Sequence, residues 1–60
     1  MAHFQVIFKD SVHGIQINHF DEYKDAQEYW DTYADVETCE AGELLDLDDG
    51  EVIWEFGEEF

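Results

Sequence analysis

Five acidic residues recur at helical spacing in the middle of the chain and are the first candidates for chemistry. They follow one another at intervals of 4, 3, 3 and 4 residues and are Asp21, Asp25, Glu28, Asp31 and Asp35. At about 100° per residue these positions cover an arc of roughly 120° on one side of a helix. Carboxylates in such a row accept charge-assisted hydrogen bonds from Arg and Lys side chains. The pattern predicts a surface that binds cationic groups.

The other side of this segment is apolar, which predicts an amphipathic helix over residues 21–37. Four positions lie within about 60° of Trp30 and complete the expected buried stripe; they are Tyr23, Ala26, Tyr33 and Ala34. Asp21 is the expected N-cap, and the helix should end near Asp35 to Glu37.

The acids weaken the helix that carries them. Like charges three or four residues apart destabilise a helix by roughly 0.2–0.5 kcal/mol per pair. Asp31, Asp35 and Glu37 also lie near the C-terminus, where each acid opposes the macrodipole at about 0.3–1 kcal/mol. A face selected only for solubility would contain more lysines than Lys24. We therefore expect a partner's cations to neutralise these acids; an ordinary solvated face is the alternative.

A second set of acids follows in residues 43–56, ELLDLDDGEVIWEF. Asp49-Gly50 predicts a two-residue type I′ hairpin turn. This register pairs Leu47 with Val52 and Leu45 with Trp54 on one face. The opposite face then holds Ile53 and the second candidate set for partner binding, which is Asp46, Asp48, Glu51 and Glu55. Three apolar side chains among the acids are candidate exposed anchors for a partner: Leu44, Ile53 and Phe60.

The first third of the chain predicts a second hairpin. Phe4, Val6 and Phe8 alternate with other residues in a strand over 3–8, and residues 9–11 have turn composition. A strand over 12–20 follows, with Ile15 and Ile17 on one face and a bulge expected at Gly14. The order ββαββ predicts one α+β domain over residues 1–60, a four-stranded antiparallel sheet with the helix packed on one face. The order of the strands is left open.

Composition narrows the class of protein. The 60 residues include one cysteine, so no intrachain disulfide can form, and no apolar run approaches the roughly 20 residues of a membrane span. We expect a reduced protein of the bacterial cytoplasm, monomeric or homodimeric, without membrane contact. Seventeen acids against two lysines give a net charge of −15. Lys9 and Asp10 cancel within residues 1–20, so residues 21–60 carry all of it.

Several functions are disfavoured. With two lysines the chain is not expected to bind nucleic acid directly. The segment DLDDGE does not fit a calcium loop, because Leu45 and Leu47 would occupy ligand positions; no metal or other cofactor is expected. The histidines are expected on the strand surface rather than on zinc. Cys39 lies among acids, which raise a thiol pKa, and 60 residues scarcely enclose a catalytic pocket. We expect no enzyme.

The spacing of the helix acids is close to that of DNA phosphates. Asp21 to Asp35 would span about 21 Å of helix, and one strand of B-DNA carries roughly six phosphates over that length. In size, acidity and lack of a catalytic centre the whole chain resembles the small phage-encoded DNA-mimic inhibitors, the anti-CRISPR and anti-restriction proteins; no single residue is carried over from them. The resemblance implies a basic DNA-binding host protein as partner, such as a CRISPR surveillance complex at its target-DNA or PAM site, or a restriction enzyme.

Two alternatives stay open. The chain is an acidic adaptor or subunit that docks on a basic protein without imitating DNA, or it comes from a halophile with an acidic surface throughout. The neutral first third counts against a halophile. Competition with the partner's own DNA separates a mimic from an adaptor.

Overall fold

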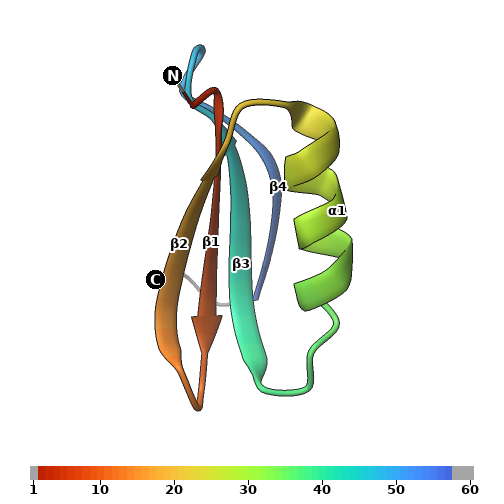
Figure 1. Ribbon diagram of the computed structural model, residues 1–60. Helices are drawn as coiled ribbons and strands as arrows, with labels where there is room; N and C mark the ends of the chain where they lie inside the picture. Colours follow the sequence, from red (N-terminus) through yellow and green to blue (C-terminus); the bar gives the residue numbers. More distant parts are fainter. Residues whose placement is uncertain (1, 58–60) are drawn as a thin grey trace.

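Residues 2–57, which the computed structural model describes, form one antiparallel sheet of four strands and one helix against a face of that sheet (Figure 1). In chain order the elements are β1 (Phe4–Asp10), β2 (Gly14–Phe20), α1 (Tyr23–Tyr33), β3 (Cys39–Asp46) and β4 (Glu51–Gly57). The strand order is β2-β1-β3-β4, so β2 and β4 are the edges. The predicted ββαββ order, α+β class and single helix layer are confirmed.

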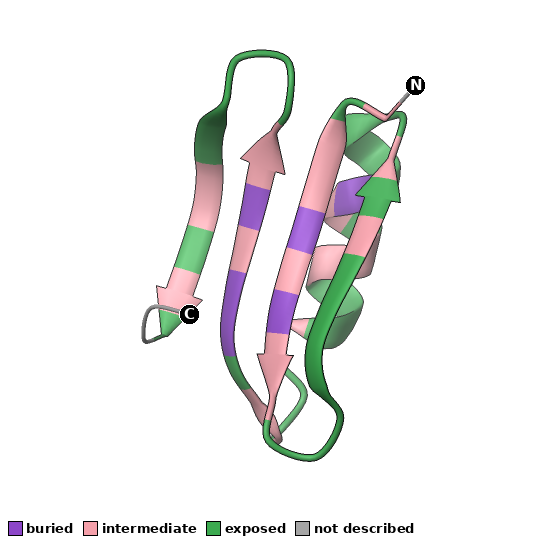
Figure 2. Ribbon diagram, turned by 90° about the vertical axis from the view of Figure 1, so that its left-hand side faces the viewer, coloured by how far each residue is buried: buried purple, intermediate pink, exposed green. Residues whose placement is uncertain are grey.

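The core lies between α1 and the two central strands. Directly paired residues of antiparallel strands share a side of the sheet, so one row of pairs defines the side facing the helix. Val6 pairs with Leu44, and Leu44 pairs with Trp54. Val6, Leu44 and Ala26 are fully buried and Phe8 is 2% exposed. In Figure 2, where the helix lies behind the sheet, the buried strand positions are confined to β1 and β3.

Ala26, rather than Trp30, marks the centre of the helix side that faces the sheet. Ala26 is fully buried, whereas Tyr33 on the predicted stripe is 46% exposed. Tyr29, outside that stripe, is partly buried against the core, and its hydroxyl accepts a 2.7 Å hydrogen bond from the Asn18 amide on β2. The buried side of α1 therefore extends to Tyr29 and also includes Trp30, which packs partly buried against the core.

The helix is shorter than predicted. It covers 11 residues, with Glu22 instead of Asp21 as N-cap and Ala34 as C-cap. The Glu22 side chain makes no capping hydrogen bond. Asp35 and Glu37 lie beyond its C-terminus, where acids in a further turn would oppose the macrodipole. Within residues 2–57 no helix has the length and apolar character needed to cross a membrane.

The β3–β4 hairpin turns through residues 47–50, because Asp46 pairs with Glu51; the predicted two-residue turn is wrong. A type I′ turn needs positive φ at both Asp49 and Gly50. Gly50 has φ 70°, but no other residue type in the described chain has positive φ. The Asp46 carboxylate stabilises the wider turn by accepting hydrogen bonds from the backbone N–H groups of Asp48, at 2.9 Å, and Asp49, at 3.4 Å.

The wider turn changes which residues face the core. Leu44, rather than the predicted Leu45, pairs with Trp54 on the helix side, and a β-bulge follows between Leu44 and Leu45. Leu44 is fully buried and Ile53 packs against the core, so neither is the exposed anchor that the sequence suggested. Phe60 lies outside the described residues.

The second face of the sheet carries no helix. Ile15 and Ile17 share this face, as expected, and are 59% and 55% exposed. The bulge expected at Gly14 is absent from the β1–β2 pairing, whose register is continuous. Gly14 instead begins β2 with φ 78°, directly after the turn.

Candidate partner-binding surface

The five acids predicted to form a helix stripe are all exposed. Asp25, Glu28 and Asp31 belong to α1, while Asp21 precedes the helix and Asp35 follows it. The helical part of the array therefore spans about 9 Å, which matches roughly three phosphates of one DNA strand. The predicted straight array of 21 Å on one helix is wrong, because the helix covers 11 residues.

None of these five carboxylates forms an ion pair within residues 2–57. The pairs in that part of the chain are His3–Asp48, at 2.9 Å, and His13–Asp10, at 3.4 Å. Lys24 is exposed on α1 and lies beyond 4 Å of every described carboxylate oxygen. The helix stripe thus presents negative charge to solvent without a cation of its own.

Two acids of the predicted hairpin set have structural partners. Asp46 is half-buried and holds the turn through the hydrogen bonds described above. The Asp48 carboxylate accepts a 2.9 Å hydrogen bond from the His3 ring and connects the hairpin to the residue before β1. Both contacts stabilise the end of the sheet near the N-terminus.

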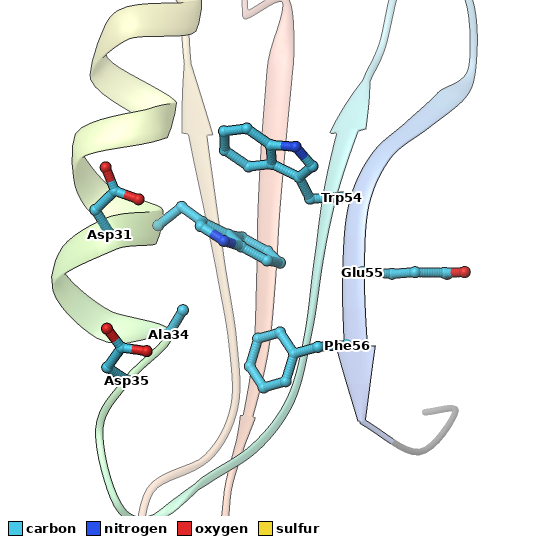
Figure 3. Close-up of a pocket in the computed structure, with 7 residues that line it drawn as sticks. Asp31, Ala34, Asp35, Trp54, Glu55 and Phe56 are labelled. Atoms are coloured by element: carbon cyan, nitrogen blue, oxygen red, sulfur yellow. The ribbon is translucent and has the colours of Figure 1, made fainter.

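The hairpin acids do not share one face as predicted. Glu51 pairs with Asp46, whereas Glu55 pairs with Glu43 on the face without a helix. In Figure 3 the side chains of Trp54 and Phe56 point toward α1. The Glu55 side chain, between them in sequence, points away from α1. The Glu55 side chain therefore points to the face opposite α1, although the residue lines a groove together with Asp31 and Asp35 of the stripe. Glu43, which the sequence analysis did not single out, is the cross-strand neighbour of Glu55.

A groove of about 470 Å³ runs between the C-terminal half of α1 and β4 (Figure 3). Its walls are aromatic: the ring centroid of Trp30 lies 5.9 Å from that of Trp54 and 5.5 Å from that of Phe56. The helix side of the opening carries two acids of the stripe, Asp31 and Asp35. The helical spacing predicted these acids on the surface, whereas Trp30 was predicted on the buried stripe and Trp54 on one face of the hairpin with Leu45.

The groove exists because the helix does not cover β4. Cα atoms of α1 approach those of β1, β2 and β3 within 8 Å but none of β4. Trp54 and Phe56 reach across the gap from the edge strand. Gly42 makes room for the Phe56 ring, because a Cβ at this position would lie 2.5 Å from that ring and 2.7 Å from the Phe8 ring. Trp30 is partly buried on α1, and its ring completes the wall.

A smaller hollow of about 210 Å³ lies at the C-terminal end of β1, beside Asp10, Tyr33 and Cys39. Asp10 is committed to hydrogen bonds, chiefly from Thr38, which lower its pKa to about 2. Burial raises the pKa of the Cys39 thiol, and the nearby Asp10 carboxylate raises it further. A thiol held in its protonated form is a poor nucleophile. This hollow supports structure rather than reaction chemistry.

In the described part of the chain no group of three or more His, Cys, Asp or Glu side chains is placed to hold a metal ion. The chemistry available at the surface is recognition of cations by carboxylates and aromatic rings. A scan against protein-family models, a search of curated proteins and a search of solved structures found no match to this chain.

Proposed function

We propose that this protein is a DNA-mimic inhibitor, which occupies the nucleic-acid-binding surface of a basic host defence protein with the helix stripe (Asp21, Asp25, Glu28, Asp31, Asp35). The observation that carries the proposal is that all five carboxylates are exposed and that none has a cationic partner within residues 2–57. A surface that binds phosphates supplies the missing cations.

Repulsion between the acidic side chains of the free protein favours its binding to a cationic surface. The chain has a net charge of −15, and such a charge weakens the compact state. A groove lined with Arg and Lys relieves this repulsion and forms charge-assisted hydrogen bonds of a strength that neutral groups do not reach. It also attracts the inhibitor over distance, so association is fast and sensitive to salt.

The resemblance in size and charge to phage-encoded inhibitors supports a bacterial cytoplasmic target. An anti-CRISPR protein that blocks target-DNA or PAM binding is the form we favour, and an anti-restriction protein is the second form of the same idea. In either case the partner's arginines and lysines contact the helix stripe, and the protein itself needs no nucleic acid, membrane or cofactor.

A capture and competition experiment tests the proposal. The immobilised protein is incubated with bacterial lysate at low salt, and proteins released at high salt are identified. For a released DNA-binding protein, the wild-type chain should displace its DNA. The variant with Asp25→Lys and Asp31→Lys should be at least tenfold weaker as a competitor.

The matched control is the variant with Glu40→Lys and Asp49→Lys, which changes the net charge equally at exposed residues outside the helix stripe and the groove. It should retain most of the wild-type competition. Equal losses in both variants would show that net charge alone, rather than the helix stripe, is responsible. Simultaneous binding of DNA and this protein to the same target would rule out mimicry.

The second candidate function is an acidic adaptor that docks on a basic protein without imitating DNA. The aromatic groove beside the helix stripe favours it, because half-buried Trp side chains are common anchors of protein–protein interfaces. For an adaptor, the captured partner would keep its DNA in the same competition assay.

A further inference from the structure

The groove between α1 and β4 combines features that belong together in a site for a cation. Trp30 packs edge-on against Phe56, with an interplanar angle of 83°, and is tilted by 46° against Trp54. The three rings are partly exposed and line one opening. The negative faces of aromatic rings attract cations, and Trp is the most effective of them.

The rim of the groove carries charge of the complementary sign. Asp31 lies in the last turn of α1, Asp35 follows the C-cap Ala34, and all three residues line the groove beside the rings. Neither acid forms an ion pair within the described residues.

The aromatic rings and the two aspartates together determine which chemical group the groove can bind. An anionic ligand would be repelled by the two aspartates. A purely apolar side chain would cover the rings but also remove water from the carboxylates. The carboxylates would then lose hydrogen bonds that the apolar group cannot replace, and this loss would weaken binding. A cation with a flat apolar surface satisfies both parts of the groove. Arginine fits better than lysine, because its planar guanidinium stacks on rings and its fork of N–H groups matches a carboxylate.

We propose that this groove binds one arginine side chain of a basic partner protein, with the guanidinium stacked against Trp30, Trp54 and Phe56 and hydrogen-bonded to Asp31 and Asp35. The inference rests on the proposed function for the source of the arginine. The groove would give the partner one specific contact, in addition to the electrostatic attraction of the helix stripe.

The test uses the free protein and a small probe, so it is independent of any target. The probe is the peptide acetyl-Gly-Arg-Gly-amide, and its control contains citrulline, which has nearly the shape of arginine without the charge. Trp30 and Trp54 are the two tryptophans of the chain, so both indole N–H resonances in an NMR titration report directly from the groove.

The arginine peptide should shift both indole resonances along a saturable curve, with the citrulline peptide at least tenfold weaker and a lysine peptide at least twofold weaker. Asp31→Asn with Asp35→Asn should weaken binding at least fivefold. The control, Asp25→Asn with Glu28→Gln, removes the same charge from α1 outside the groove and should change binding less than twofold. Phe56→Leu removes one ring, keeps both reporters and should weaken binding at least threefold in a protein whose amide spectrum remains dispersed.

Three results would overturn the inference: no saturable shift with the arginine peptide, equal shifts with citrulline, or equal losses in the groove and control variants. A lysine peptide that binds as tightly as arginine would overturn the choice of guanidinium. If the groove binds arginine but the protein displaces no DNA from a captured target, the mimicry proposal fails while the groove remains a cation site.

Discussion

At the scale of single residues, Asp10 shows how one carboxylate connects two loops. One oxygen accepts hydrogen bonds from the backbone N–H groups of Val12, at 2.7 Å, and His13, at 3.0 Å. The other accepts a 2.8 Å hydrogen bond from the Thr38 hydroxyl, in the connection between α1 and β3. These bonds favour the charged form, so the Asp10 pKa falls from 3.8 to about 2, with the Thr38 hydroxyl as the largest cause.

Asp10→Asn should therefore destabilise the protein at neutral pH and have less effect in acid. Because the folded-state pKa is lowered, the Asp10 contribution is fully present above the unfolded value of 3.8 and is lost as pH falls toward 2. Urea unfolding of wild type and variant at pH 7 and at about pH 2.5 measures this difference. Asp21→Asn is the control, since Asp21 makes no side-chain hydrogen bond within the described residues. A difference between wild type and Asp10→Asn that stays constant with pH would contradict the argument.

At the scale of elements, α1 contributes both to the helix stripe and to one wall of the aromatic groove. Its buried side includes Ala26 and the partly buried Trp30, and Trp30 lines the groove together with Asp31 and Asp35. The edge strand β4 supplies Trp54 and Phe56 from the other side. Neither element forms the groove alone, and the separation of α1 from β4 keeps it open.

The position of each acid along α1 should decide its effect on stability. Asp31→Lys places a cation in the last turn, where the macrodipole favours it, and removes repulsion with Glu28 and Asp35; we expect a gain of about 1 kcal/mol. Asp25→Lys makes the same charge change in the first turn, where the macrodipole favours an acid. This variant should be stabilised less than Asp31→Lys or be destabilised. Urea unfolding at neutral pH and low salt compares them. Equal gains would show that overall repulsion, rather than helix position, controls stability.

At the scale of the whole molecule, the charge is concentrated in a small volume. The protein measures 30 × 20 × 15 Å and carries a net charge of −15. At 0.1 M salt the screening length is about 10 Å, shorter than all three of these dimensions. The stability of the free protein and the stability of its complex with a basic partner therefore depend on salt in opposite directions.

Added NaCl should stabilise the free protein while it weakens the complex. Between 50 mM and 500 mM we expect a gain of about 1 kcal/mol in the free energy of unfolding, which corresponds to roughly 4–8 °C in the midpoint of thermal melts followed by circular dichroism. The protein should already be folded at 50 mM, unlike a halophilic domain. A chain that is unfolded in dilute buffer would favour the halophilic alternative. A midpoint that does not rise with salt would contradict the role assigned to self-repulsion.

Local patterns predicted much of this fold. The alternation of Phe4, Val6 and Phe8 is a property of a strand with one buried side, and the apolar positions around Trp30 recur at helical spacing, so the ββαββ order follows from neighbours along the chain. The exposed acids of the helix stripe were also identified in this way. The hairpin acids do not share the one face that was predicted, because the turn covers four residues and a bulge lies between Leu44 and Leu45.

The sequence by itself determined the element types and the excess of negative charge, since both depend on residue identity and local spacing. Only the tertiary structure decided that Leu44 rather than Leu45 faces the helix, that Tyr29 packs against the core and bonds to Asn18, and that β4 is an edge strand. These features depend on how side chains distant in sequence fill the core together. The aromatic groove follows from all three, and that is why no spacing along the chain reveals it.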